Sequence, residues 1–209
     1  MKIVIDIDNT LVDYRKSLFK YIKQSNIILE GIKPELKMCE LKNKIKKNIG
    51  DNFWQTVQAY IYSDKSSDVT FYKNSCDFIK KAFEENFEIY LVSHKTIFGL
   101  HKSKNINIRE ISSKRINNWL CKEKIRNFIK EVIFTDTFDE KISIINEINP
   151  SIIIDDLLEI HTKIMEKRES TITCKNILFE GNDIDKSTIY LNNVFKANTW
   201  LEIIEFVFN

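Results

Sequence analysis

The chain has 209 residues, of which 43% are apolar, and 32 basic residues nearly balance 30 acidic ones to give a net charge of +2. This length and apolar content allow one domain with an inserted segment and exclude two large domains. Because the charge is nearly balanced, no overall field favours a nucleic acid polymer or an acidic membrane as a partner. The sequence does not specify an oligomeric state.

The cysteines stand singly and form no C-x-x-C pair, which favours a reducing compartment over a disulfide framework or a zinc site. They are Cys39, Cys76, Cys121 and Cys174. No leader-like segment follows Met1, and no apolar run approaches the roughly 18 residues of a membrane-spanning helix. We therefore expect a cytoplasmic protein that does not enter a membrane.

The first predicted element is a run of β-branched residues near the N-terminus, which is typical of a strand buried on both faces at the centre of a parallel sheet. The run ends in Asp6 and Asp8, and Thr10 follows. Residues two apart in a strand point to the same side, so both acids can face one small ligand. The carboxyl end of such a strand is also where parallel sheets bind ligands.

Residues 13–70 contain no predicted strand. Helical patterns cover 14–28, 35–49 and 52–62, with turn residues between them. An insertion directly after the first strand would lie above the carboxyl edge of the sheet. We therefore expect a small helical cap over residues 13–70, and an α/β core built from residues 1–12 and 71–209.

Strands and helices alternate through the rest of the chain. Apolar β-rich runs predict strands over 87–92, 131–135, 151–154, 176–179 and 193–196. Helical spacing of apolar residues predicts helices over 73–86, 108–122, 140–149 and 199–208. This alternation predicts a mainly parallel sheet between two layers of helices, which is a Rossmann-like three-layer α/β fold.

Polar residues recur at the ends of these elements. Ser93 lies at the tip of the second core strand, Lys141 at the start of a helix, and Asp155 and Asp156 at the end of another strand. Taken alone, the D-x-D-x-T string could be an ordinary turn in which carboxylates accept backbone hydrogen bonds. The other polar residues, in this order and at these places, favour a catalytic site.

With these residues, the sequence resembles the haloacid dehalogenase-like (HAD) superfamily of phosphohydrolases. The four motifs of that family run in the same order and are matched by Asp6, Asp8 and Thr10, by Ser93, by Lys141, and by Asp155 and Asp156. The first and fourth motifs are specific, whereas a serine after a strand and a lysine on a helix are weak signals. The resemblance covers nearly the whole chain and implies that the insertion is the small helical cap of the family.

The resemblance implies a Mg²⁺-dependent phosphatase, and converging carboxylates suit that cation. The expected metal ligands are Asp6, the main-chain carbonyl of Asp8, and Asp156, with Asp155 either binding directly or supporting the site. Asp6 attacks phosphorus to give an aspartyl-phosphate. Asp8 protonates the leaving oxygen and later takes a proton from the hydrolytic water.

The remaining roles concern the phosphoryl group. Ser93 is expected to donate a hydrogen bond to it and Lys141 to neutralise its charge. Thr10 is expected to orient the loop and, with Ser93, His94 and Lys141, to belong to the substrate-binding set. The alternatives to Lys141 are Lys102, Lys104 and Lys114.

The segment that follows Ser93 holds His94, Lys95, Thr96 and His101. We interpret it as a solvated connection, the alternative being a second anion-binding site that grips the substrate beyond its phosphate.

Several alternatives follow for function. The four glycines are far apart, which excludes a Walker A loop or a G-x-G-x-x-G cradle. The intact acid pair favours phosphate chemistry over dehalogenation. The expected substrate is a small phosphorylated metabolite, either a nucleotide or a sugar phosphate, because a helical cap must close over the site to exclude water. The sequence also resembles cytosolic 5′-deoxyribonucleotidases and HAD proteins of surface-polysaccharide synthesis, and neither resemblance extends to the residues that set specificity. A phosphomutase, or a binding or regulatory protein on this fold with weak or no catalysis, remains open.

Overall fold

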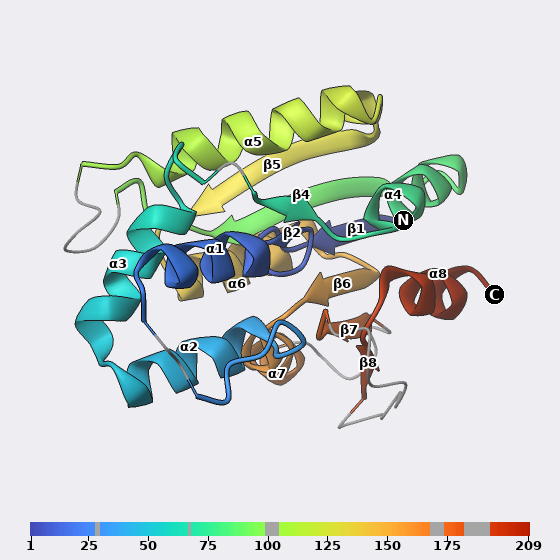
Figure 1. The fold of residues 1–209 in the computed structure, drawn as a ribbon. Coiled ribbons are helices and arrows are strands. Elements are labelled where there is room, and N and C mark those ends of the chain that lie inside the picture. Colours follow the sequence, from blue (N-terminus) through green and yellow to red (C-terminus); the bar gives the residue numbers. More distant parts are fainter. Residues whose placement is uncertain (28–29, 67, 99–104, 168–173, 182–192) are drawn as a thin grey trace.

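The structure is a computed structural model that describes residues 1–209 except 28–29, 67, 99–104, 168–173 and 182–192. A six-stranded sheet in the order β5-β4-β1-β6-β7-β8 lies between helices (Figure 1), and every neighbouring pair of strands is parallel. Its strands are β1 (Lys2–Ile5), β4 (Glu88–His94), β5 (Ile129–Thr135), β6 (Ile152–Asp155), β7 (Lys175–Phe179) and β8 (Val194–Ala197).

The side chains of β1 alternate between two apolar layers, which is why its sequence reads as a continuous run. Ile3 and Ile5 pack in one buried cluster, and Val4 packs in the other. The first cluster includes residues of α4 (Ser75–Glu84), α5 (Ile108–Lys122) and α8 (Trp200–Phe208). The second includes residues of α6 (Phe138–Ile148) and α7 (Leu158–Lys167). The predicted three-layer α/β fold is therefore confirmed.

The predicted core elements match the structure closely, with two differences. β4 continues to His94, beyond the predicted end at residue 92, so Ser93 lies inside the strand rather than after it. The sequence interpretation also omitted α7, which links β6 to β7 in the expected parallel manner. Its inner face is made by Ile160 and Ile164, one helical turn apart.

The segment between β1 and α4 contains the three predicted helices. They are α1 (Arg15–Gln24), α2 (Met38–Asn48) and α3 (Asp51–Ile61), and they gather on the side toward which the arrows of β4 and β5 point (Figure 1). The expectation of no strand between residues 13 and 70 is wrong at both borders. A short antiparallel ribbon pairs β2 (Val12–Asp13) with β3 (Thr70–Phe71) and closes the base of the segment. The division into core and cap stays a prediction.

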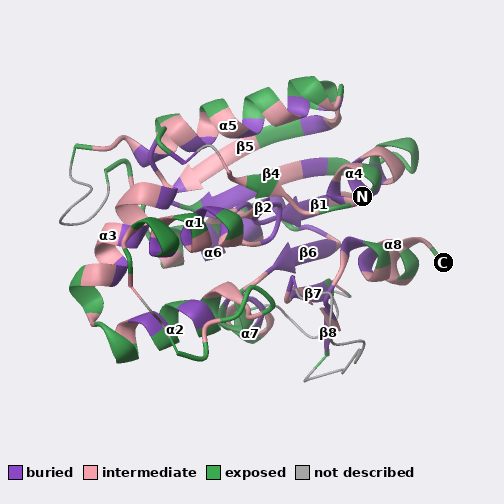
Figure 2. Ribbon diagram, in the orientation of Figure 1, coloured by how far each residue is buried: buried purple, intermediate pink, exposed green. Residues whose placement is uncertain are grey.

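Burial follows the layers. Figure 2 shows buried residues along β1 and β6 and exposed residues on the outer surfaces of α2 and α5. None of the helices in the described part of the chain has both the length and the hydropathy needed to cross a bilayer.

Candidate active site

The order of the strands gathers the predicted site residues at one edge of the sheet. The chain runs from β1 to β4 and β5 on one side, and then returns to place β6 on the other side of β1. Ligands of parallel α/β sheets bind at the carboxyl ends of strands where the order reverses in this way. Asp6 therefore lies between the strand that carries Ser93 and the strand that ends at Asp155.

A tight turn follows β1 and carries the second acid. The amides of Leu11 and Val12 both donate to the carbonyl of Ile7, at 3.0 and 2.9 Å, and the amide of Asn9 donates to the carbonyl of Val12 at 2.9 Å. Asn9 has a φ of +61°, a left-handed conformation that asparagine tolerates better than most residues. The turn holds Asp8 at the carboxyl end of the sheet.

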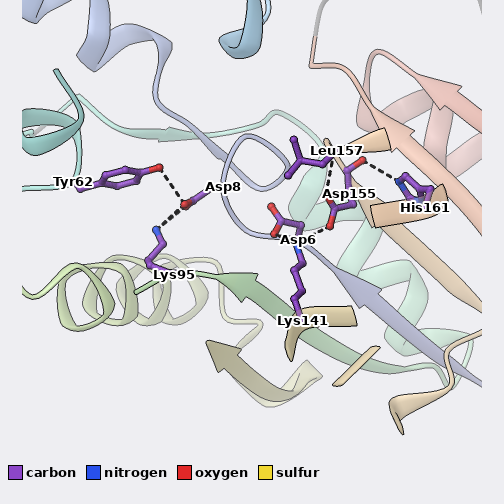
Figure 3. A network of polar contacts seen from close by, with 8 residues as sticks. All are labelled: Asp6, Asp8, Tyr62, Lys95, Lys141, Asp155, Leu157 and His161. Atoms are coloured by element: carbon purple, nitrogen blue, oxygen red, sulfur yellow. Dashed lines mark hydrogen bonds and ion pairs between the residues drawn. The ribbon is translucent and has the colours of Figure 1, made fainter. Parts of the chain in front are cut away.

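Three carboxylates converge at this edge of the sheet near one buried lysine. Asp6, Asp155 and Asp156 can each offer an oxygen such that the three atoms lie within 4.8 Å of one another. Figure 3 shows two of these carboxylates, Asp6 and Asp155, beside Lys141. Lys141 donates from its Nζ to Oδ1 of Asp6 at 2.5 Å and to Oδ2 of Asp155 at 2.7 Å. It projects from the first turn of α6, which is capped by the Thr137 hydroxyl. Lys141 thus lies where the third motif was predicted.

Burial has the largest influence on the pKa values of this cluster, and the charges of its members come next. Burial, with the nearby charges of Asp155 and Asp8, raises the pKa of Asp6 to about 7, although Lys141 opposes the rise. Burial and the charges of Asp6 and Asp155 raise the pKa of Asp156 well above its usual range. Burial acts to lower the pKa of Lys141, but its two carboxylate partners outweigh burial and raise it. Lys141 therefore stays charged.

Both carboxylate oxygens and the carbonyl oxygen of Asp155 have hydrogen-bond partners in the protein. Its Oδ1 accepts a hydrogen bond from the amide of Leu157 at 3.0 Å, while Oδ2 accepts from Lys141. A ring nitrogen of the buried His161 lies 3.3 Å from the Asp155 carbonyl oxygen, and the other ring nitrogen lies 3.3 Å from Oδ1 of Asn176. These contacts fix the direction of the Asp155 carboxylate.

The donor set fits a hard divalent cation. Within the described ranges, the cluster offers only carboxylate oxygens, which are the ligands that Mg²⁺ prefers. When its three carboxylates are ionised, the one ammonium of Lys141 leaves two negative charges uncompensated. A divalent cation carries the charge that would balance them.

Asp8 lies apart from this cluster and has its own set of donors. The hydroxyl of Tyr14 donates to Oδ1 at 2.8 Å, and the hydroxyl of Tyr62 donates to Oδ2 at 3.3 Å. Lys95 Nζ lies 2.8 Å from both carboxylate oxygens. The two tyrosines flank α1 and α3, so the helical segment meets the core at Asp8.

Lys95 corrects the interpretation of the segment after Ser93 as a solvated connection. Its side chain is only 3% exposed and forms an ion pair with Asp8. The one signal available in the sequence was its spacing, because a residue two positions after Ser93 along a strand points to the same side. Burial by the helical segment and by α5 could not be read from that spacing.

The other predicted residues are more scattered. Ser93 is buried in β4 beside β1. His94 is exposed; its Nε2 lies 3.0 Å from the carbonyl oxygen of Asp136, and its ring meets the edge of Phe138. These contacts turn His94 toward β5, away from β1. Lys114 is exposed and pairs with Glu110. Lys102, Lys104 and His101 lie outside the described residues.

Thr10 serves the packing of the loop. It is fully buried, and its carbonyl accepts a hydrogen bond from the indole of Trp200 at 3.1 Å. Its hydroxyl has no hydrogen-bond partner among the described residues. The structure thus places the backbone of Thr10, rather than its hydroxyl, in a defined contact.

No protein-family model and no curated protein matches the sequence. Solved structures do match. A HAD-superfamily hydrolase from Ehrlichia chaffeensis is similar at a TM-score of 0.52 and 15% identity, over 98% of this chain and 94% of that one. A predicted phosphatase from Clostridium acetobutylicum is similar at 0.55 and 14% identity, over 99% and 97%.

The chain has the fold of the HAD superfamily. A HAD family hydrolase from Deinococcus radiodurans R1 with bound phosphate and sodium is also similar, at a TM-score of 0.54 and 8% identity, over 97% of this chain and 92% of that one. At these identities the likeness extends to the HAD fold alone. The chemistry must be argued from the residues of the site.

Proposed function

We propose that the protein is a cytoplasmic, Mg²⁺-dependent phosphatase that hydrolyses a small soluble phosphomonoester through an aspartyl-phosphate on Asp6. The observation that carries this proposal is the convergence of Asp6, Asp155 and Asp156 around Lys141, with Asp8 on the following turn. The HAD fold, shared with structures described as phosphatases and hydrolases, supports the same chemistry.

In this proposal Asp6, Asp156 and the carbonyl of Asp8 hold the metal, while Asp155 is oriented by its own hydrogen bonds to complete the site. When bound, Mg²⁺ offsets the negative charge of the substrate phosphate and of the attacking carboxylate. The protein adds the ammonium of Lys141, 2.5 Å from Asp6, which lowers the repulsion between that carboxylate and a phosphate dianion.

The reaction proceeds in two displacements at phosphorus. An oxygen of Asp6 forms a bond to phosphorus as the bond to the leaving oxygen breaks, and Asp8 gives a proton to that oxygen. A water molecule then attacks the phosphorus of the aspartyl-phosphate and passes a proton to Asp8. The bond between phosphorus and Asp6 breaks, so inorganic phosphate leaves and the carboxylate is restored. Ser93 donates a hydrogen bond to the transferring group.

The helical segment supports a small substrate. Tyr14, just before α1, and Tyr62, just after α3, both donate hydrogen bonds to Asp8. The helical segment therefore borders the place where the leaving group departs. A lid in this position favours a soluble metabolite over a phosphoprotein, because it must close to exclude water. A nucleotide or a sugar phosphate fits this description.

The test is phosphate release from a panel of nucleotides, sugar phosphates and p-nitrophenyl phosphate, in Mg²⁺ or in EDTA. Wild type is compared with Asp6→Asn and with Asp51→Asn, a matched change at an exposed carboxylate that pairs only with Lys46 among the described residues. Release that needs Mg²⁺, persists in Asp51→Asn and is abolished in Asp6→Asn supports the proposal.

The other outcomes assign the alternatives. Release in EDTA, or by Asp6→Asn, overturns the mechanism. Transfer of phosphate to a second hydroxyl of a sugar phosphate, in place of release, indicates a phosphomutase. Mg²⁺ binding by calorimetry without turnover of any compound indicates a binding or regulatory protein.

A further inference from the structure

Lys95 is a buried lysine for which the mechanism above has no use. Its Nζ lies 2.8 Å from both oxygens of Asp8 and donates to the hydroxyl of Ser112 on α5 at 2.8 Å. It also lies 4.6 Å from the centre of the Tyr62 ring, where a cation is attracted to the aromatic face. The ammonium is therefore held from the core, from α5 and from the helical segment at once.

The backbone of Lys95 is fixed as well. Its amide donates to the carbonyl of Thr135 at 2.9 Å, and its carbonyl accepts from Nε of Arg109 at 2.6 Å. Arg109 in turn pairs through Nη2 with Oδ1 of Asp136 at 2.7 Å. Because both its backbone and its ammonium are held, Lys95 loses little conformational entropy when it pairs with a carboxylate. It is therefore suited to keeping that carboxylate in one position.

The two buried lysines serve different carboxylates. Lys141 binds Asp6 and Asp155, whereas Lys95 binds Asp8 (Figure 3). Asp8 stands on a turn rather than in the sheet, and its side chain is 17% exposed, so its direction depends on these contacts. Small errors in the placement of a group that transfers a proton cost much of its effect.

We propose that Lys95 is a positioning residue that orients the carboxyl group of Asp8, which when protonated gives its proton to the leaving oxygen and then takes one back from the hydrolytic water. The inference rests on the proposed phosphatase function and adds a residue to it. It predicts that loss of Lys95 resembles loss of Asp8. An alkyl phosphate needs a proton on its leaving oxygen, while p-nitrophenolate leaves readily as an anion.

The experiment compares kcat/KM for an alkyl phosphate and for p-nitrophenyl phosphate in wild type, Lys95→Met, Asp8→Asn and the double variant. We expect Lys95→Met to lose about 10- to 100-fold on the alkyl phosphate and less than about 5-fold on p-nitrophenyl phosphate. Asp8→Asn should show the same contrast. The double variant should lose little more than Asp8→Asn alone, because residues that act as a unit are not additive.

Three further variants separate positioning from general damage. Lys95→Arg keeps a cationic donor and should recover part of the loss on the alkyl phosphate. Ser112→Ala removes one hydrogen-bond partner of the Lys95 ammonium and leaves Asp8 unchanged. It should lower kcat/KM less than Lys95→Met does, and again more for the alkyl phosphate than for p-nitrophenyl phosphate. This variant provides the test if Lys95→Met does not fold. Lys114→Met removes an exposed lysine of α5, the helix that carries Ser112, and should leave kcat/KM for both substrates unchanged.

Equal losses on the two substrates, or losses of Lys95→Met and Asp8→Asn that multiply in the double variant, would show that Lys95 acts independently of Asp8 and overturn the assignment. Unchanged kinetics in Lys95→Met and Ser112→Ala would do the same. Absence of turnover by wild type on both substrates overturns the proposed function instead, and this inference with it.

Discussion

The indole N–H of Trp200 donates to the carbonyl oxygen of Thr10 at 3.1 Å, across 190 residues of sequence. Both residues are buried. Trp200 opens α8, and its ring also packs near Phe78 and Phe179. The final helix therefore secures the turn that carries Asp8, although it contributes no side chain to the carboxylate cluster.

Replacing Trp200 with phenylalanine keeps an aromatic ring but removes the donor. The buried carbonyl of Thr10 then lacks its partner, and we expect the free energy of unfolding to fall by about 1–3 kcal/mol in urea titrations. Trp119→Phe is the control, because that ring stacks on Phe71 at 4.1 Å and phenylalanine can keep the stack. Equal losses in the two variants would contradict a special role for the indole N–H.

Lys141→Met should destabilise the metal-free protein strongly. The substitution leaves Asp6 and Asp155 buried without their ammonium, and removing one partner of a buried ion pair costs about 3 kcal/mol or more. Mg²⁺ should stabilise this variant more than wild type, since the cation replaces part of the missing charge. Thermal melts with Mg²⁺ or EDTA measure both effects.

Lys163→Met supplies the comparison for Lys141, because Lys163 is only partly buried and pairs at the surface with Glu159. Its loss should stay within about 0.5 kcal/mol. A Lys141→Met protein as stable as Lys163→Met would show that the buried cluster does not depend on its lysine.

The raised pKa of Asp6 makes the metal-free protein sensitive to pH in a defined direction. Between the ordinary value of 3.8 and about 7, folded Asp6 keeps a proton that the unfolded chain has released. Folding is therefore favoured by this group at low pH, and the contribution is lost as pH rises toward 7. In EDTA, the free energy of unfolding of wild type should fall by at least about 1 kcal/mol, relative to that of Asp6→Asn, as the pH rises from about 5 to about 8.

Urea midpoints of the two proteins at both pH values check this prediction. Because Asp6→Asn cannot titrate at this position, the difference between the proteins reports the carboxyl of Asp6 together with its effect on the pKa of Asp156, and removes the contribution of groups outside the cluster. A difference that does not change with pH, or that grows in favour of wild type as pH rises, would contradict the raised pKa.

Gly181 lies just after β7 with a φ of +58°, and a Cβ built on it would stand 2.6 Å from the hydroxyl oxygen of Tyr72 and 2.9 Å from two ring carbons. Gly181→Ala should therefore cost about 1–3 kcal/mol, from the left-handed conformation and the contact together. Gly31→Ala has a similar φ of +69° but meets only the flexible end of Lys44 at 3.4 Å, and should cost less. The melting temperatures of the two variants test the difference.

The parts of the site that were predictable from sequence are those set by local pattern. The run before Asp6 is apolar on both faces because β1 is covered by helices on both sides, and the strand ends where the carboxylates begin. Asp155 ends a strand of the same kind. Lys141 was predicted to lie at the start of a helix, and the structure confirms this position in the first turn of α6.

Other parts depend on packing that no local pattern encodes. Nothing in the residues next to Lys95 predicts its burial. Its ammonium contacts Ser112, Asp8 and Tyr62, which lie far from it in the chain. β2 and β3 have two residues each, too few for a period to be visible. The contact between Trp200 and Thr10 likewise exists only after the two ends of the chain meet.

The position of β1 in the sheet also dictates when the molecule can assemble. Of the strands of this sheet, β1 is synthesised first, yet its two neighbours begin pairing at Glu88 and Ile152. Such long-range parallel pairing slows folding, because the entropy cost of closing large loops comes before the contacts that offset it. β1 therefore cannot pair with β4 until the residues from Glu88 onward have been added, or with β6 until those from Ile152 onward have been added. The carboxylate cluster can form only after Asp156 has been added, so no shorter nascent chain carries the site.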